Sequence, residues 1–273
     1  DGELDDTATV TLTIDPVNDA PVLAAVSDVD FDEDTSTSIS VSGSDVDGDA
    51  LTFSIAGGTD ITATLDGSDI AFTASANFNG SETFTITTTD SELSDSQDIT
   101  VTVNAVNDPP VATTGLSGTT NEDQDIVINL SGSDVDGDVL TFSLDSDATN
   151  GSVVVDGNIA TYSPNQDYNG DDSFTFTVSD GELDDSATVT LTIDPVNDAP
   201  VLATVEDIAF DEDTSTSISV SGSDVDGDAL TFNIIGGSDI TATLDGSDVA
   251  FTASENFNGS ETFTITTTDS ELS

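Results

Sequence analysis

The residues best suited to chemistry are acids set two positions apart. Asp45, Asp47 and Asp49 surround Gly48 in one short segment. Two carboxylates about 4 Å apart repel each other by about 1 kcal/mol even in water. A divalent cation turns that repulsion into binding, and Ca²⁺ takes six to eight oxygen ligands from carboxylates, amides and carbonyls. A solvated, charge-rich turn is the alternative explanation for a single loop of this kind.

The acidic loop recurs at a fixed period. The eight residues Ser-Gly-Ser-Asp-Val-Asp-Gly-Asp begin at Ser42, Ser131 and Ser221, which are 89 and 90 positions apart. The tripeptide Val-Asn-Asp keeps the same phase, beginning at positions 17, 106 and 196, and Ala-Pro or Pro-Pro follows it each time. A fixed period of this length predicts a tandem array of modules. Acidic loops that repeat in phase favour Ca²⁺ over a chance accumulation of charge.

The repeats predict three modules preceded by a remnant. The first range is expected to be the last strand and linker of a preceding module, and the last range a module truncated before its final strand. The four ranges are 1–17, 18–106, 107–196 and 197–273.

Residues 1–17 duplicate residues 180–196, except that Thr7 replaces Ser186. Two explanations fit this duplication. Either the chain samples a stretch of a longer array, or its leading strand completes the last module of a neighbouring chain. The first is favoured because residues 1–4 repeat the position of residues 269–272 instead of continuing from it.

Strict alternation of polar and apolar residues predicts β-strands throughout the chain. Residues 7–14, Thr-Ala-Thr-Val-Thr-Leu-Thr-Ile, show the pattern most clearly. In the first module we expect seven strands with a core of Phe53, Ile55, Phe72, Phe84, Ile86 and Val101, and in the second a core containing Phe142, Tyr162, Phe174 and Phe176. The expected strands are Val22–Val26, Ser38–Ser42, Leu51–Ile55, Ile61–Leu65, Ile70–Thr73, Thr83–Thr88 and Ile99–Val103. Seven short strands in about 90 residues are typical of an immunoglobulin-like sandwich.

Composition excludes several classes of function. The 273 residues include 56 acids and no Lys, Arg, His or Cys, which gives a net charge of -56. Binding to nucleic acid or to an anionic membrane requires Lys and Arg, so neither partner is expected, and no segment is apolar enough to insert into a membrane. Without His, Cys or Lys there is no usual general base or nucleophile, so we do not expect an enzyme.

The linkers and acidic loops resemble those of cadherin repeats, and in particular the cadherin-like repeats of large bacterial surface proteins and adhesins. The segment Asp15-Pro16-Val17-Asn18-Asp19-Ala20-Pro21 resembles the cadherin linker Asp-x-Asn-Asp-Asn-x-Pro. Glu33 matches the glutamate after the first strand, the Asp45-Val46-Asp47 loop matches Asp-x-Asp, and Asp90 matches the acid before the last hairpin. The resemblance covers the whole chain. It implies an all-β fold of tandem, seven-stranded Greek-key sandwiches in an elongated rod.

The resemblance also implies that Ca²⁺ binds between successive modules. Each joint combines a glutamate of one module with the linker, the Asp-x-Asp loop and the late Asp of the next, except that the glutamate of the leading joint is expected to come from outside these 273 residues. The leading joint has Asp15, Asn18, Asp19, Asp45, Asp47 and Asp90; the middle joint Glu33, Asn107, Asp108, Asp134, Asp136 and Asp180; and the last joint Glu122, Asp194, Asn197, Asp198, Asp224, Asp226 and Asp269.

Three departures from the family pattern affect the expected ion sites. Asn104 replaces the first linker Asp, which predicts weaker binding at the middle joint. The family's Asp-Arg-Glu segment is replaced by sequences beginning at Asn77, Asp167 and Asn256, which leaves the number of ions per joint open. Further acids could compensate, namely Asp34, Asp49, Asp123, Asp138, Asp213 and Asp228.

These features predict an extracellular spacer of a bacterial cell-surface adhesin or filament, stiffened by Ca²⁺ and supporting adhesion, biofilm or cell contact. Its partners would be neighbouring modules of the same chain and, in a fibre, identical chains. One alternative is a module that binds a sugar or a protein, although there is no Trp and there are only two Tyr. Another is a head-to-tail filament subunit completed by strand donation. Adaptation to high salt is a rival explanation of the charge, but it does not explain acids gathered at module joints.

Overall fold

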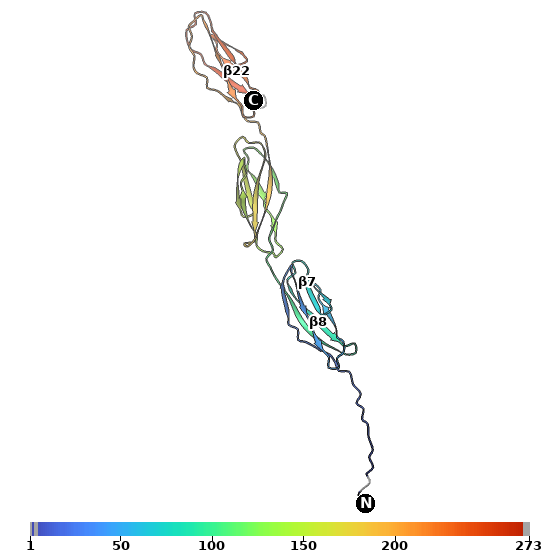
Figure 1. Ribbon diagram of the computed structural model, residues 1–273. Helices are drawn as coiled ribbons and strands as arrows, with labels where there is room; N and C mark the ends of the chain where they lie inside the picture. Colours follow the sequence, from blue (N-terminus) through green and yellow to red (C-terminus); the bar gives the residue numbers. More distant parts are fainter. Residues whose placement is uncertain (1, 3–4, 270–273) are drawn as a thin grey trace. The chain divides into compact units, whose positions relative to one another are not determined.

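The computed structural model describes residues 2 and 5–269 (Figure 1). All regular structure in this part of the chain is β-strand, which confirms the predicted all-β class. No helix in the described residues is long and apolar enough to cross a membrane. The chain divides into two compact units between Asp108 and Pro109.

The first unit contains a β-sandwich. A four-stranded sheet of order β2-β9-β8-β5 faces a three-stranded sheet of order β3-β7-β6, and β1 pairs with β4. The strands are β1 (Val22–Leu23), β2 (Val29–Asp32), β3 (Ser36–Ser40), β4 (Gly43–Ser44), β5 (Thr52–Gly57), β6 (Ile61–Asp66), β7 (Asp69–Ala74), β8 (Gly80–Thr89) and β9 (Ser94–Asn104).

The core of this sandwich lies between its two sheets. Phe72 of β7 and Phe84 of β8 are fully buried and meet edge to face, with ring centroids 5.4 Å apart. Ile86 and Val101 are also buried, as predicted, because every second residue of a strand points to the same face. Other predicted core residues, such as Phe53, are only partly buried beside this cluster.

The structure differs from the predicted strands in three ways, one of which is the unpredicted two-residue strand β4. The expected strand Val22–Val26 is shortened to β1, and the chain then forms the unpredicted strand β2. β2 pairs in parallel with β9, with Val29 opposite Val101 and Phe31 opposite Val103. Four residues are too few for a convincing alternation, and a parallel partner about 70 residues away leaves no local signal in the sequence.

The second unit begins with a sandwich of the same design. Its sheets have the orders β11-β18-β17-β14 and β12-β16-β15, and β10 pairs with β13. The strands are β10 (Val111–Ala112), β11 (Ser117–Asn121), β12 (Ile126–Asn129), β13 (Gly132–Ser133), β14 (Thr141–Ser146), β15 (Gly151–Asp156), β16 (Ile159–Pro164), β17 (Gly170–Ser179) and β18 (Asp184–Asp194). Tyr162, Phe174 and Phe176 lie in its core as predicted, whereas Phe142 is partly buried.

The third group of strands forms smaller sheets. β22 pairs with β25, β24 lies between β20 and β23, and β19 pairs with β21. The strands are β19 (Val201–Leu202), β20 (Ser215–Ser219), β21 (Gly222–Ser223), β22 (Thr231–Gly236), β23 (Ile240–Asp245), β24 (Asp248–Ala253) and β25 (Phe263–Thr268). Its fully buried core is reduced to Val220, Val249 and Phe251.

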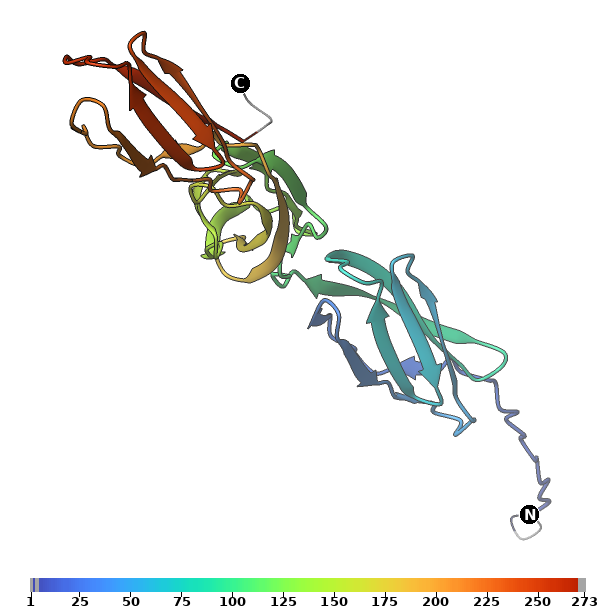
Figure 2. The same ribbon diagram turned by 90° about the horizontal axis from the view of Figure 1, so that it is seen from above.

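Residues 5–19 form no strand, which contradicts the prediction for residues 7–14. Both Figure 1 and Figure 2 draw the segment without an arrow. Val10, Leu12 and Ile14 are 78%, 88% and 93% exposed. The alternating pattern would give a strand one apolar face, but a strand also needs a neighbouring strand to supply its hydrogen bonds. In the described residues no strand lies beside residues 7–14, so the segment stays irregular.

Candidate metal centres

The Asp-x-Asp-Gly-Asp loop is organised by its first carboxylate. Oδ1 of Asp45, directly after β4, accepts the backbone N–H of Asp47 at 2.8 Å and of Asp49 at 3.4 Å. Gly48 has φ of 81°, a left-handed conformation that glycine adopts without strain. The other two copies repeat the arrangement: Oδ1 of Asp134 accepts from Asp136, Gly137 and Asp138, and Oδ1 of Asp224 accepts from Asp226 and Asp228.

The second carboxylate oxygen of the same residue is left for another partner. Oδ2 of Asp45 and Oδ2 of Asp224 are buried and accept no hydrogen bond from any described residue. Ligand oxygens of three neighbouring acids lie within 4.8 Å of one another in the Asp45, Asp47, Asp49 cluster and in the Asp134, Asp136, Asp138 cluster. A buried charged oxygen without a donor is unfavourable, and a bound cation would remove that penalty.

The linker is tied to the loop and to the late Asp by hydrogen bonds. Asn18 donates its Nδ2–H to Oδ2 of Asp90 at 2.9 Å, and the backbone N–H of Asp19 donates to Oδ2 of Asp47 at 2.8 Å. The leading joint therefore brings together five of the six predicted residues. The sixth, Asp15, is exposed in the preceding segment.

The geometry of the leading joint recurs at the last joint. Asn197 donates to Oδ2 of Asp269 at 2.8 Å, and the N–H of Asp198 donates to Oδ2 of Asp226 at 2.8 Å. At the leading joint, the backbone N–H of Leu93, the Asn18 side chain and the N–H of Glu92 hold the pKa of Asp90 below its usual value. Asp90 thus stays ionised, as a cation ligand must be.

The predicted glutamates are buried and bound to the linker that follows their own sandwich. Glu33, directly after β2, is 3% exposed; its Oε1 accepts the N–H of Val106 at 2.7 Å, and its own N–H donates to the carbonyl of Asn104. Oε2 of Glu33 is buried and accepts no hydrogen bond from the described residues. Glu122 repeats the pattern at 4% exposed, and its Oε1 accepts the N–H of Val196 at 2.6 Å.

At the last joint, acids from both sides of the linker meet within the second unit. Carboxylate oxygens of Glu122, Asp198 and Asp226 lie within 4.8 Å of one another. Burial raises the pKa of Asp198, and the nearby charges of Asp167, Asp226, Glu122 and Asp123 raise it further. Oδ2 of Asp198 is buried and accepts no hydrogen bond from the described residues. Like charges held this close are stabilised by a divalent cation.

Sequence reasoning missed one cluster at this joint. Asp123, Asp167 and Asp198 also place carboxylate oxygens within 4.8 Å of one another. Asp123 was noted only as an additional acid, and Asp167 only as a departure from the family pattern. The available signal was that Asp167 stands where the other two modules have Asn77 and Asn256.

The middle joint connects the two compact units, so its residues form two separate halves. Glu33, Asn107 and Asp108 belong to the first unit. Asp134, Asp136 and Asp180 belong to the second, where Oδ1 of Asp180 accepts the N–H of Glu182 and of Leu183 at 2.7 Å each. Glu33 contacts its linker as Glu122 does at the last joint, and Asp134 organises its loop as Asp45 and Asp224 do.

Other acids serve the fold instead. The carboxylate of Glu82 accepts the backbone N–H of Thr59, Asp60 and Ile61 at 2.9–3.1 Å. Glu261 holds the matching turn of the third group of strands. Both oxygens of Glu82 accept hydrogen bonds, whereas Oε2 of Glu33 accepts none from the described residues. This difference in hydrogen bonding distinguishes acids that stabilise a turn from candidate metal ligands.

Comparison with curated proteins shows similarity to part of a bacterial chitinase. Chitinase A of Pseudoalteromonas piscicida is 33% identical over 131 residues, which cover 44% of this chain and 15% of that protein. The chain therefore corresponds to a small part of that relative's length.

Several solved structures align with much of this chain. Human protocadherin-24 EC1-2 aligns with 64% of this chain and 97% of its own length, at 16% identity and a TM-score of 0.45. Drosophila N-cadherin EC1-4 aligns with 92% and 75%, at 13% identity and a TM-score of 0.43. An endo-fucoidan hydrolase from glycoside hydrolase family 107 aligns with 93% and 43%, at 17% identity and a TM-score of 0.31.

The family is shown by the sequence pattern of the bacterial Ig domain, which matches residues 18–102, 107–192 and 197–273. This match covers most of the chain and confirms the predicted immunoglobulin-like tandem repeats. The chain belongs to the bacterial Ig domain family and carries three of its domains in tandem.

Proposed function

We propose that this chain is an extracellular spacer whose domain joints bind Ca²⁺, so that bound ions restrict bending between successive Ig domains. The observation that carries the proposal is the meeting of Glu122, Asp198 and Asp226 at one linker. These acids come from both domains and from the segment between them. A cation held there would link the domains without new apolar contacts.

The chemistry of the ligand set favours Ca²⁺ among common cations. All candidate ligands are carboxylate or amide oxygens, which hard cations prefer, and the chain has no His or Cys to suit zinc. Mg²⁺ demands a compact octahedron, whereas Ca²⁺ accepts six to eight ligands in flexible geometry. The buried, unbonded oxygens of Glu33, Asp45 and Asp224 fit such a site.

A spacer of this kind suits a bacterial surface protein, in which domains that contact only their sequence neighbours give an array whose length grows with repeat number. In this proposal the chain has no catalytic role and holds another domain away from the cell. Adhesion to a surface or to another cell, including in a biofilm, would then depend on that other domain.

The test combines calorimetric titration of Ca²⁺ with thermal unfolding in Ca²⁺, Mg²⁺ or EGTA. We expect Ca²⁺ to raise the melting temperature and Mg²⁺ to do so much less. The double variant Glu33→Gln with Glu122→Gln should weaken binding at the middle and last joints by about tenfold or more, because each of these two joints loses a charged ligand. Glu92→Gln with Glu182→Gln is the matched control, since both are exposed turn residues. Unfolding that is the same in Ca²⁺ and EGTA would rule out the proposal.

Unfolding measured at high NaCl concentration distinguishes specific Ca²⁺ binding from a general adaptation to salt. Screening by NaCl would stabilise any strongly acidic chain, but it would not replace an ion held by six or more oxygens. We therefore expect Ca²⁺ to keep most of its stabilising effect in 1 M NaCl, whereas under simple charge adaptation NaCl alone would make the effect of Ca²⁺ disappear.

The chitinase relative favours a second setting for the same spacer. That relative is named for action on chitin, and its similarity to this chain covers 15% of its length. In this setting the domains would separate a polysaccharide-degrading domain from its anchor without binding the polysaccharide themselves. A chitin pull-down of the purified chain should leave it in solution, whereas retention would favour a sugar-binding module.

A further inference from the structure

The chain enters and leaves the first sandwich at opposite ends of one strand, β9. Asn18 of the entering linker donates to Asp90, in the turn between β8 and β9. Val106 of the leaving linker donates its N–H to Glu33, beyond the other end of β9. The eleven residues of β9 span about 36 Å at about 3.3 Å per residue. Tension along the chain therefore acts on this sandwich from the two ends of β9.

The strand that joins the entering segment to β9 runs in the same direction as β9. β2 pairs in parallel with β9 over its whole length. Beyond β2, the N–H of Glu33 donates to the carbonyl of Asn104 at 2.9 Å, and Oε1 of Glu33 accepts the N–H of Val106 at 2.7 Å. The pairing thus continues past the last residue of both strands.

Three side-chain contacts extend the pairing toward the entering linker. In each contact, a residue of the segment before β2 is bonded to a residue of β9 that lies 71 or 72 positions later. The three pairs are Leu23 with Asp95, Val26 with Gln97, and Asp28 with Thr100. We call residues 23–33 together with residues 95–106 the parallel seam.

The second sandwich has the same seam with a different bond at one position. β11 pairs in parallel with β18 over five residues, and the N–H of Glu122 donates to the carbonyl of Asp194 at 2.9 Å. The N–H of Thr190, the counterpart of Thr100, donates to the carbonyl of Leu116 at 3.1 Å. In the first sandwich the matching donor is bonded to a side chain instead. This N–H is therefore bonded in both seams, although the acceptor differs.

The direction of the two strands decides how the seam responds to tension. The entering linker pulls β2 by its first residue, and the leaving linker pulls β9 by its last. The two strands then tend to slide past each other, and the evenly spaced hydrogen bonds of a parallel pair are loaded together. Two strands pulled apart from the same end separate one bond at a time, which requires less force.

We propose that these domains bear tension along the chain, and that the parallel seam is the part of each complete sandwich that resists it. Among the described strands of the first sandwich, β2 and β9 are the pair that joins the entering segment directly to the leaving one. β1 pairs with β4 over two residues and is expected to detach earlier. The seam needs no bound ion, so a load-bearing role stands or falls independently of Ca²⁺ binding.

The test is single-molecule force spectroscopy in EGTA with two directions of force. The chain contains no Cys, so introduced Cys residues are unambiguous attachment points in the full chain. Ala20→Cys with Pro109→Cys loads the seam from both ends, whereas Ala20→Cys with Glu92→Cys pulls from the entering end alone. We expect the mean unfolding force of the first pair to be several times that of the second. Equal forces for the two pairs would overturn the proposal.

One bond of the seam can be removed without changing the core or a candidate metal ligand. Asp28 is exposed, and its Oδ1 accepts the N–H of Thr100 at 2.8 Å. At constant force between the first pair of attachment points, Asp28→Ala should unfold about tenfold faster, because one lost hydrogen bond changes a rate by about that factor. Asp28→Asn keeps an acceptor oxygen and should stay close to the unchanged chain. Equal acceleration in both variants would assign the effect to charge and contradict the role of the seam.

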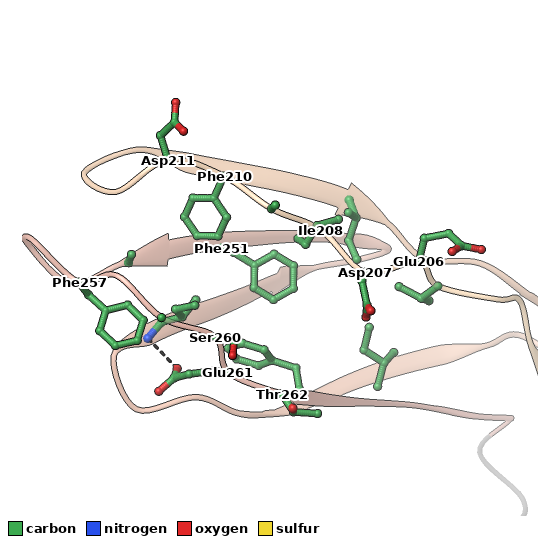
Figure 3. A pocket seen from close by; sticks show the side chains of 18 of the residues that line it. Glu206, Asp207, Ile208, Phe210, Asp211, Phe251, Phe257, Ser260, Glu261 and Thr262 are labelled. Carbon is green, nitrogen blue, oxygen red and sulfur yellow. Dashed lines mark hydrogen bonds between the residues drawn. The ribbon is translucent and has the colours of Figure 1, made fainter.

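A control acid lies outside the seam. Glu82 closes the turn between β5 and β6, and Figure 3 shows the matching bond of Glu261 as a dashed line. Glu82→Gln should lower the melting temperature but leave the unfolding rate at constant force nearly unchanged, because this turn does not join β2 to β9. If the unfolding rate followed thermal stability in every variant, wherever the substitution lies, the seam would have no special role and the proposal would be wrong.

Discussion

Glu33 and Glu82 are both carboxylates of the first sandwich, yet their surroundings differ. Glu82 accepts hydrogen bonds at both oxygens, whereas one oxygen of Glu33 is buried without a donor in the described residues. A buried polar atom left unbonded costs about 1–3 kcal/mol, and more when charged. At the scale of single residues, this difference separates the acids that stabilise a turn from those suited to a cation.

Tyr162 shows how an acid supports the core of the second sandwich. Its ring is fully buried, and its hydroxyl donates to Oδ2 of Asp172 at 3.0 Å. Burial, followed by this bond and the charge of Asp172, raises the pKa of Tyr162 well above its usual value. Asp172 also accepts the N–H of Thr149 and of Asn150, so it holds the same turn that Glu82 holds in the first sandwich.

We predict that Tyr162→Phe lowers the unfolding free energy of the second sandwich by about 1.5–3 kcal/mol, the range for a hydrogen bond to a charged group. Denaturant unfolding would measure the change. Tyr168→Phe is the control, because its hydroxyl donates to the carbonyl of Asp171 in an exposed position and should matter less. Similar losses in both variants would contradict a special role for the buried bond.

At the scale of elements, one carboxylate fixes the connection between β5 and β6. The turn contains Gly57 and Gly58, whose φ angles of 125° and 81° suit glycine. An added Cβ at Gly58 would lie 2.2 Å from the carbonyl oxygen of Ile61. The Glu82 carboxylate then closes the turn by accepting the N–H groups that follow it.

This arrangement predicts a pH dependence. The N–H of Thr59 lowers the pKa of Glu82 most; burial opposes the shift, and the N–H groups of Ile61 and Asp60 add to it. A lowered folded-state pKa means that Glu82 contributes stability above its unfolded-state value, near 4.5, and that this contribution is lost as the pH falls through the lower folded-state value.

Glu82→Gln should therefore lower the melting temperature at pH 7 by several degrees and flatten the loss of stability below about pH 4.5. Thermal unfolding across pH 3–7 would measure both effects. Glu92→Gln removes the same charge from an exposed turn and serves as the control. If the melting temperature of Glu82→Gln fell as steeply at acid pH as that of the unchanged chain, this role of Glu82 would be contradicted.

At the scale of the whole molecule, domains of one family are joined by linkers that are not equivalent. Asn104 stands in one linker where Asp15 and Asp194 stand in the others, and its Nδ2–H donates to Oδ1 of Asp32 at 3.3 Å. The middle linker thus carries one negative charge fewer. Under the proposed function, its ions bind less tightly than those of the last joint.

We predict that Asn104→Asp raises Ca²⁺ affinity at the middle joint by about fivefold, since one more nearby charge contributes about 1 kcal/mol at a partly solvated site. In calorimetric titration, the dissociation constant of the weak sites should approach that of the strong sites. Asn233→Asp adds the same charge on an exposed strand face and should leave the titration unchanged. An equal gain in both variants would show that only net charge matters.

The sequence by itself determined the strand class, the repeat and most of the core, because a strand with one buried face must alternate and a repeated module must recur in phase. It also identified the acids of the linkers and loops from their spacing. Only the tertiary structure decided which of those acids keep a buried oxygen without a donor, because that depends on N–H groups from distant residues. The parallel pairing of β2 with β9 and the meeting of Asp123, Asp167 and Asp198 likewise depend on contacts across the fold. Residues 5–15 show the limit most clearly: the same sequence is a buried strand at β18 and an exposed segment at the amino terminus, because a strand exists only where a neighbouring strand accepts its hydrogen bonds.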